Sequence, residues 1–248
     1  MRNPREVPVT IPRPSTVHRG DPAPWADRDT STLDLDAVRA RLAHVNPWRP
    51  EEELIDPAVR RSAVLVPLLD TDEVNLVLGK RSAHLPSHRG DLSFPGGRQQ
   101  PEDADLLATA LREAHEEMGM APEKVEVLGE LDHLGTMVTR FAIAPFAGVV
   151  HQSPGELVAQ DGEVDRILVV PLQRLLEPGV YRQEIWSGVP ATNALRGPED
   201  PSVIRRGDPT YGPSGARRVN FFEVDEWDVI WGATATILLQ FLDVVTST

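Results

Sequence analysis

The sequence predicts an α/β protein, because β-rich runs bounded by turn signals alternate with segments of helical spacing. Two β-rich runs, at 63–69 and 74–78, are separated by Asp70-Thr71-Asp72-Glu73, which predicts a β-hairpin. A helix follows, since apolar residues recur at helical spacing at Leu107, Leu111, Ala114 and Met118. Further β-rich runs come after this helix, at 125–131, 141–150 and 166–170. One stripe of the helix can therefore pack against a sheet.

The remaining segments predict one domain over residues 31–248, preceded by an arm. Residues 1–30 are rich in Pro, Arg and Asp, and we expect a flexible arm or a strap over the domain. Apolar spacing predicts a helix over 33–45, and 171–176 resembles a short helix. Residues 188–216 contain many glycines and prolines, together with Arg196, Arg205 and Arg206, and predict a long surface loop. Such a loop is a lid, a binding segment or simply disordered.

Composition excludes several functional classes. The formal net charge of −13 disfavours broad contact with the phosphate backbone of nucleic acids, which needs a basic face. No run of 18 apolar residues is present, so we expect no membrane span. Zero cysteines exclude disulfides and thiol catalysis, and with the lack of an apolar signal region they favour a cytoplasmic protein. The sequence does not determine the oligomeric state, and a homodimer is one alternative.

The helix around residue 113 carries an unusual concentration of negative charge. Glu113, Glu116 and Glu117 lie at i, i+3 and i+4, beside Arg112. Like charges at this spacing destabilise a helix by roughly 0.2–0.5 kcal/mol per pair, so a cation among them is the simplest explanation. A solvated surface helix is the plain alternative. The preceding Phe94-Pro95-Gly96-Gly97 favours the metal site, because its glycines let the backbone approach a ligand closely.

This arrangement resembles the Nudix box, written as Gly, five residues, Glu, seven residues, Arg-Glu-apolar-x-Glu-Glu-x-Gly-apolar. The second half matches position by position, at Arg112, Glu113, Ala114, Glu116, Glu117, Gly119 and Met120. The first half departs: Gly97 lies one residue too far from Arg112, and Asp103 substitutes for the early Glu within the cluster of Glu102, Asp103 and Asp105. The resemblance implies a Nudix-type α/β/α sandwich with a mixed central sheet.

Flanking residues resemble the coenzyme A diphosphatase branch of that family. Its additional signature agrees with Arg81, Ser82, Leu85, His88, Gly90, Phe94, Pro95, Gly96 and Gly97. Pro86 stands where the branch usually has Arg, and Asp91 where it usually has Gln, and both changes should weaken the binding of phosphate. Ile230-Trp231-Gly232-Ala233-Thr234-Ala235 is similar to the start of the last helix of that branch.

The resemblance implies hydrolysis of a nucleoside diphosphate linked to another group, with Mg²⁺ or Mn²⁺ as cofactor. Glu113 and Glu117 are the expected direct metal ligands, Glu116 binds directly or through water, and the turn of Gly96 and Gly97 supplies a backbone carbonyl. Arg112 would hold a glutamate in place. Magnesium keeps several waters and binds through few carboxylates together with substrate phosphates.

The remaining roles have open alternatives. The general base is Glu163, in a later loop, or Glu116, within the box. Arg81 and His88 contact substrate phosphates, or His88 is a structural turn residue. His115 occupies a variable slot and should face solvent.

Three functional hypotheses follow. The first is a metal-dependent diphosphatase acting on coenzyme A or acyl-CoA, giving 3′,5′-ADP and (acyl-)4′-phosphopantetheine. The second is a hydrolase of ADP-ribose or another nucleotide sugar, motivated by Pro86 and Asp91. The third, of another class, is a Nudix-like module that binds a nucleotide for regulation and performs no chemistry.

Overall fold

The computed structural model describes residues 11, 13–31, 33–49, 59–85, 88–136, 141–187 and 217–247. Within these ranges the central sheet is mixed and has eight strands. Five of them are neighbours in the order β4-β3-β2-β8-β6; in addition, β5 pairs with β2, β7 with β8 and β9 with β3. Its strands are β2 (Arg60–Asp70), β3 (Val74–Arg81), β4 (Leu92–Ser93), β5 (Gly96–Arg98), β6 (Val125–Glu130), β7 (Leu134–Thr136), β8 (Phe141–Val150) and β9 (Val164–Pro171). The β2–β8 pair is parallel and the others are antiparallel, which confirms the predicted α/β class with a mixed sheet.

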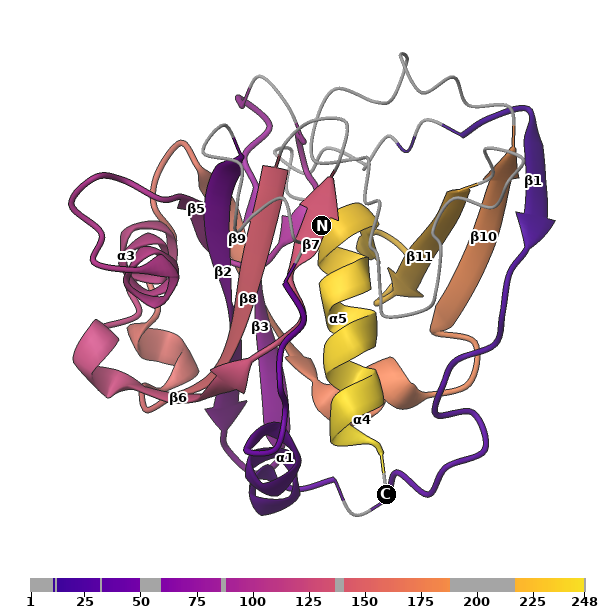
Figure 1. Cartoon of the computed structure of the whole chain (residues 1–248), viewed down its shortest axis with the longest axis horizontal. Coiled ribbons are helices and arrows are strands. Elements are labelled where there is room, and N and C mark those ends of the chain that lie inside the picture. Colours follow the sequence, from indigo (N-terminus) through magenta and orange to yellow (C-terminus); the bar gives the residue numbers. More distant parts are fainter. Residues whose placement is uncertain are drawn as a thin grey trace.

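Helices cover both faces of this sheet (Figure 1). The helix α3 (Leu106–Met118) packs on one face through Ala110, Ala114 and Met118, which are fully buried. The opposite face is covered by α1 (Leu35–Leu42), α4 (Leu172–Leu176) and α5 (Gly232–Val245). Two short 3-10 helices, η1 (Pro122–Lys124) and η2 (Pro154–Glu156), lie in the connections. The expected α/β/α arrangement is therefore present.

A second sheet lies beyond α5 and was not predicted. It consists of β1 (Thr16–Arg19), β10 (Tyr181–Ser187), β11 (Arg217–Glu223) and β12 (Val229–Trp231), all antiparallel and in the order β1-β10-β11-β12. Figure 1 shows α5 between this sheet and the central one. Phe222 of β11 is fully buried and contacts Trp25 and Tyr181, with ring centroids 6.2 and 5.2 Å away. Helix α5 thus packs between two sheets.

Most predicted elements occur, with shifted ends. The hairpin of β2 and β3 forms as expected, with Leu68 opposite Leu76, and the helix predicted over 33–45 is confined to Leu35–Leu42. On α3 the stripe is shifted: Ala110 is fully buried, whereas Leu111 is only partly buried. The loop predicted over 188–216 lies outside the described residues.

The described part of the N-terminal segment is packed as a strap. Strand β1 pairs with β10 from Thr16 to Arg19, and Trp25 is buried in the core. Residues 1–10 and 12 lie outside the described residues, so a flexible arm over 1–30 and a domain starting at residue 31 stay predictions. In the described part of the chain, no helix is long and apolar enough to cross a membrane.

Candidate active site

Carboxylates of α3 face Gly96 and Gly97, which were expected to form a turn and are the first two residues of β5, paired with β2. Helix α3 begins after Asp105, whose side chain accepts a 2.8 Å hydrogen bond from the amide of Ala108, and it ends at Gly119 in the left-handed conformation, with φ of 67°. Gly96 donates its N–H to Glu117 Oε2 over 3.3 Å. A Cβ atom at Gly96 would lie 2.4 Å from the backbone oxygen of Ala63, so only glycine fits at that position, and one at Gly97 would lie 2.4 Å from Glu113 Oε1, so this carboxylate lies directly against the glycine backbone.

Burial and mutual repulsion perturb the two glutamates that face Gly96 and Gly97. Burial raises the pKa of Glu117 to about 7; Arg81 and the Gly96 amide oppose this effect, while Glu113 and Glu163 add to it. Burial also raises the pKa of Glu113, an effect that Arg112 partly opposes. Glu117 is buried, with only 6% of the residue exposed. Negative charge therefore exceeds positive charge at this site, and a cation would relieve the imbalance.

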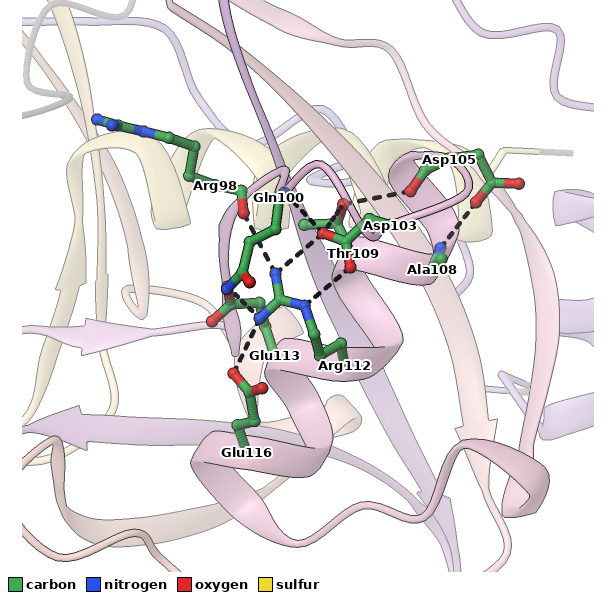
Figure 2. A network of polar contacts seen from close by, with 9 residues as sticks. All are labelled: Arg98, Gln100, Asp103, Asp105, Ala108, Thr109, Arg112, Glu113 and Glu116. Atoms are coloured by element: carbon green, nitrogen blue, oxygen red, sulfur yellow. Dashed lines mark hydrogen bonds and ion pairs between the residues drawn. The ribbon is translucent and has the colours of Figure 1, made fainter.

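Arg112 is held by a ring of oxygens on the outer side of α3 (Figure 2). Its Nε and Nη2 donate to the two oxygens of Asp103 over 2.9 and 3.0 Å, which is bidentate geometry. Its Nη1 lies 2.9 Å from both Glu113 Oε1 and Glu116 Oε2, and Nη2 also donates to the carbonyl of Arg98. Arg112 thus fixes the position of Glu113 and acts as a positioning residue.

Asp103, which we aligned with the early glutamate of the sequence motif, is anchored by three neighbouring residues. Besides the hydrogen bonds from Arg112, it accepts hydrogen bonds from the backbone N–H of Gln100 and the hydroxyl of Thr109, both 2.9 Å long. The guanidinium of Arg112 holds the pKa of the Asp103 carboxyl well below its usual range. The side chain of Asp103 therefore ties the loop before α3 to the middle of the helix.

The two alternatives for the general base differ in their surroundings. Glu116 is half-exposed and forms an ion pair with Arg112. Glu163 is exposed in the turn before β9, and its backbone carbonyl accepts a 2.8 Å hydrogen bond from the amide of Ser82. The negative charge of Glu163 raises the pKa of both Glu113 and Glu117, so its carboxylate lies near the same pair of glutamates.

Arg81 and His88 line a cavity of about 260 Å³ beside Gly96 and Gly97. The positive charge of Arg81 is close enough to Glu117 to lower its pKa. His88 has a left-handed backbone, with φ of 57°, and its Nδ1 lies 3.0 Å from Asp91 Oδ2. His88 is therefore a turn residue as well as part of the cavity wall. His115 is exposed, as predicted.

Asp91 connects this loop to the C-terminal helix. Its Oδ1 accepts a 3.0 Å hydrogen bond from the indole N–H of Trp231, and its other oxygen contacts His88. The carboxylate that was expected to repel phosphate therefore engages two neighbouring groups. Sequence reasoning missed this role, because residues 91 and 231 are far apart in the chain. The other departure from the signature, Pro86, lies outside the described residues.

Sequence comparison decides the family. A family model described as the NUDIX domain matches residues 59–187. Proteins described as uncharacterized Nudix hydrolase NudL, from Salmonella paratyphi B and Salmonella schwarzengrund, are each 34% identical over 212 residues, covering 86% of this chain and 95% of the relative. The chain belongs to the Nudix family. It is thus a hydrolase of diphosphate bonds, a class that acts on small nucleotide substrates and generally requires divalent metal ions.

Solved structures of Nudix proteins resemble this chain more distantly. A NUDIX hydrolase from Nitrosomonas europaea is 18% identical, covers 46% of this chain and 58% of its own, and gives a TM-score of 0.39. A MutT/nudix family protein from Enterococcus faecalis is 13% identical, covers 74% of this chain and 61% of its own, and gives a TM-score of 0.44. Membership of the Nudix family rests on the sequence matches.

The donor set of this Nudix site fits a hard divalent cation. Glu113 and Glu117 supply carboxylate oxygens beside the backbone of Gly96 and Gly97, and burial raises the pKa of both, so a bound cation would favour their charged forms. Among the described residues, no three acidic or histidine side chains already form a complete cage. Glu113 and Glu116 both pair with Arg112 Nη1 at 2.9 Å, but Glu113 also lies against Gly97, whereas Glu116 is half-exposed.

Proposed function

We propose that this Nudix hydrolase cleaves the diphosphate of coenzyme A or an acyl-CoA, producing 3′,5′-ADP and (acyl-)4′-phosphopantetheine. One observation carries the proposal: the cavity that begins at Gly96 and Gly97, beside Glu113 and Glu117, continues to Trp231 at the start of α5. The two segments that resemble the coenzyme A branch, 79–97 and 230–235, therefore line one continuous site. Mg²⁺ or Mn²⁺ is the proposed cofactor, bound by Glu113, Glu117 and a carbonyl of Gly96 or Gly97.

Each charged residue has a proposed task. A divalent ion bound here would offset the charge that develops on the phosphoryl oxygens and help to activate water. Glu163 accepts a proton from the attacking water, whose oxygen forms a bond to phosphorus while the bond to the bridging oxygen breaks. Glu163 is favoured over Glu116 because its charge acts on both Glu113 and Glu117, whereas Glu116 is half-exposed and paired with Arg112. Arg81 neutralises part of the negative charge of the diphosphate, and Arg112 keeps Glu113 in place.

ADP-ribose or another nucleotide sugar is the second candidate substrate. It is favoured by Asp91, which places a carboxylate where the coenzyme A signature has an amide. A regulatory module that binds a nucleotide without turnover would not need the buried carboxylate of Glu117 beside a second carboxylate, Glu113.

Substrate assays with metal separate these candidates. With Mg²⁺ or Mn²⁺ present, we expect the purified chain to release 3′,5′-ADP from coenzyme A faster than it releases AMP from ADP-ribose. Glu117→Gln should lower kcat/KM by more than about 100-fold, because it removes a direct ligand and outer-shell changes alone cost about 10–100-fold. The matched control is Glu123→Gln, an exposed residue of η1, which should retain full activity. Turnover of ADP-ribose without turnover of coenzyme A would refute the first choice, and full activity of Glu117→Gln would refute the metal role.

A further inference from the structure

The strand β9 forms one edge of the central sheet. It pairs with β3, and within the described ranges no other strand pairs with it. A groove of about 350 Å³ extends along β9, lined by residues 166–171, Arg174, Val224 and Asp225. Val169, in the middle of this tract, is 37% exposed. A further strand therefore has room to approach the edge.

Alternate residues of β9 turn their backbone groups away from β3. Ser82, directly after β3, donates its N–H to the carbonyl of Glu163, directly before β9, whereas the N–H of the preceding residue donates to the loop before β4. Because backbone groups alternate in direction along a strand, the even-numbered residues of β3 face β9. Their partners on β9 are Arg166, Leu168 and Val170. The N–H and C=O groups of Ile167 and Val169 therefore point outward.

This outward edge lacks the charges that protect two other edges. Unpaired edge strands in natural proteins carry charged residues or proline, which discourage pairing with another chain. The edge strand β1 contains His18 and Arg19, and β6 contains two glutamates. Between Arg166 and Pro171, β9 contains only Ile, Leu and Val. Residues 167–170 therefore form an uncharged edge that is suited to pairing.

A second copy of β9 fits this edge by symmetry. In an antiparallel pair about a two-fold axis at Leu168, Ile167 of each copy lies opposite Val169 of the other, and the two residues exchange both N–H···O=C bonds. Arg166 then lies opposite Val170, so no like charges oppose each other, which matters between chains of net charge −13.

The sequence of β9 favours this axis over its neighbours. An axis at Val169 would place Ile167 opposite Pro171, which has no N–H to donate. An axis at Ile167 would place Val169 opposite Asp165, at the end of β9 where the pairing with β3 changes register. The axis at Leu168 therefore gives the most complete set of hydrogen bonds.

We propose that β9 is the interface of a homodimer, in which the central sheets of two copies join into one continuous sheet through residues 167–169. Neither Ile167 nor Val169 lines the cavity beside Gly96 and Gly97, so the proposal does not depend on the substrate. It goes beyond the proposed function and can fail or succeed independently of it.

Sedimentation equilibrium of the full chain tests the interface. With rising concentration, the wild type should approach twice the mass of one chain. Val169→Pro removes an outward N–H that β3 does not use, and this hydrogen bond is lost on both sides of the axis. Its dimer dissociation constant should therefore rise at least about tenfold.

A second variant leaves the backbone intact. Val169→Lys places a charge against Ile167 of the second copy and should also shift the chain to the monomer. The matched control is Val127→Lys on β6, because Val127 is 39% exposed, close to the 37% of Val169. That variant should dimerise like the wild type.

Hydrogen exchange provides a measurement at the edge itself. The amides of Ile167 and Val169 should exchange rapidly in dilute wild type and slowly at concentrations where the dimer forms, whereas those of Leu168 and Val170 should be protected throughout. This alternation follows from the direction of the backbone groups.

Four results would overturn the proposal. The first is a chain that stays monomeric at millimolar concentration, which would leave the edge to a strand of another protein. The second is a dimer that neither Val169→Pro nor Val169→Lys weakens. The third is an equal loss of dimer in Val127→Lys and Val169→Lys. The fourth is protection of the Ile167 and Val169 amides that does not depend on concentration, which would show that the chain covers its own edge.

Discussion

Two clusters of charged side chains in this protein have opposite ratios of positive to negative groups. Around Arg112, one guanidinium is shared by the carboxylates of Asp103, Glu113 and Glu116. Around Asp228, one carboxylate is shared by two cations: Lys80 Nζ lies 2.8 Å from Oδ1, and Arg166 contacts Oδ2. The first cluster is anionic and partly open, whereas the carboxylate of the second is 1% exposed.

The balance of charge separates a structural cluster from a functional one. Lys80 and Arg166 are directly opposite each other on β3 and β9, where like charges repel, and the carboxylate of Asp228 pairs with both and offsets one of their two charges. That cluster is complete and joins β12 to the central sheet. The cluster on α3 has an excess of carboxylates, and burial, with a smaller effect of neighbouring glutamates, raises the pKa of Glu113 and Glu117. The surplus is what a bound cation would neutralise.

Removing the carboxylate of Asp228 should have the largest effect on stability. Asp228→Ala leaves Lys80 buried without its partner, so we expect a loss of about 3–5 kcal/mol in the free energy of unfolding, measured by urea denaturation at neutral pH. The matched control is Asp243→Ala, which breaks a partly exposed pair with Arg28 and should cost less than about 1 kcal/mol. Equal losses in the two variants would contradict the structural role of Asp228.

Neutralising Glu117 should increase the free energy of unfolding of the metal-free protein, the opposite of the effect of Asp228→Ala. Its pKa of about 7 lies above the ordinary value of 4.5, so ionisation opposes folding: the penalty is absent below pH 4.5, grows between pH 4.5 and 7, and is complete above pH 7. Glu117→Gln should therefore stabilise the metal-free chain at pH 8 by up to about 3 kcal/mol, and by little at pH 4.5. Thermal unfolding at the two pH values measures the difference.

Magnesium provides the complementary measurement. At pH 8 it should raise the Tm of the wild type and barely change that of Glu117→Gln, because binding to the folded state alone stabilises it. Glu116→Gln, on the exposed side of the same helix, should leave the metal-free stability within about 0.5 kcal/mol of the wild type. A destabilised Glu117→Gln at pH 8 would show that this glutamate is a structural group like Asp228.

Removing the charge of Asp103, which holds Arg112, should have the smallest effect, a change in the Mg²⁺ requirement. Asp103→Asn removes the bidentate ion pair, so Glu113 loses its fixed position and we expect the concentration of Mg²⁺ for half-maximal activity to rise roughly tenfold. Asp105→Asn is the control, because asparagine caps a helix as well as aspartate does and should leave the metal requirement unchanged. An unchanged requirement in Asp103→Asn would remove Asp103 from the positioning of the site.

The elements and residues predicted correctly from the sequence are those specified by neighbouring residues. The β2–β3 hairpin follows from two β-rich runs around a polar turn, and α3 follows from an apolar period with Asp105 and Gly119 at its ends. Because the motif covers 96–120, it also predicts that Glu113 and Glu117 lie beside Gly96 and Gly97, and they do. The substitution of Asp103 for the early glutamate was expected from the same short segment, and its bidentate contact with Arg112 fits that role.

Contacts between distant segments were not predictable in this way. Strand β1 has four exposed residues and no alternation of polar and apolar side chains, so only its pairing with β10 makes it a strand. Asp91 was read as a stray negative charge because its partner, Trp231, lies 140 positions away. The outer edge of β9 corresponds to no sequence motif, because the place of a strand in a sheet depends on all the pairings together.

The position of α5 between the two sheets has a consequence for how the protein is made. The carboxylates of α3 leave the ribosome long before Trp231 and Ile237, which complete the cavity. Roughly 130 residues separate Glu117 from the end of α5 at Val245, which corresponds to roughly 6–25 s of synthesis at 5–20 residues per second. During that interval the apolar face that α5 will cover has no permanent neighbour. Pulse-labelled chains stalled before residue 232 should therefore bind chaperones and digest rapidly with protease.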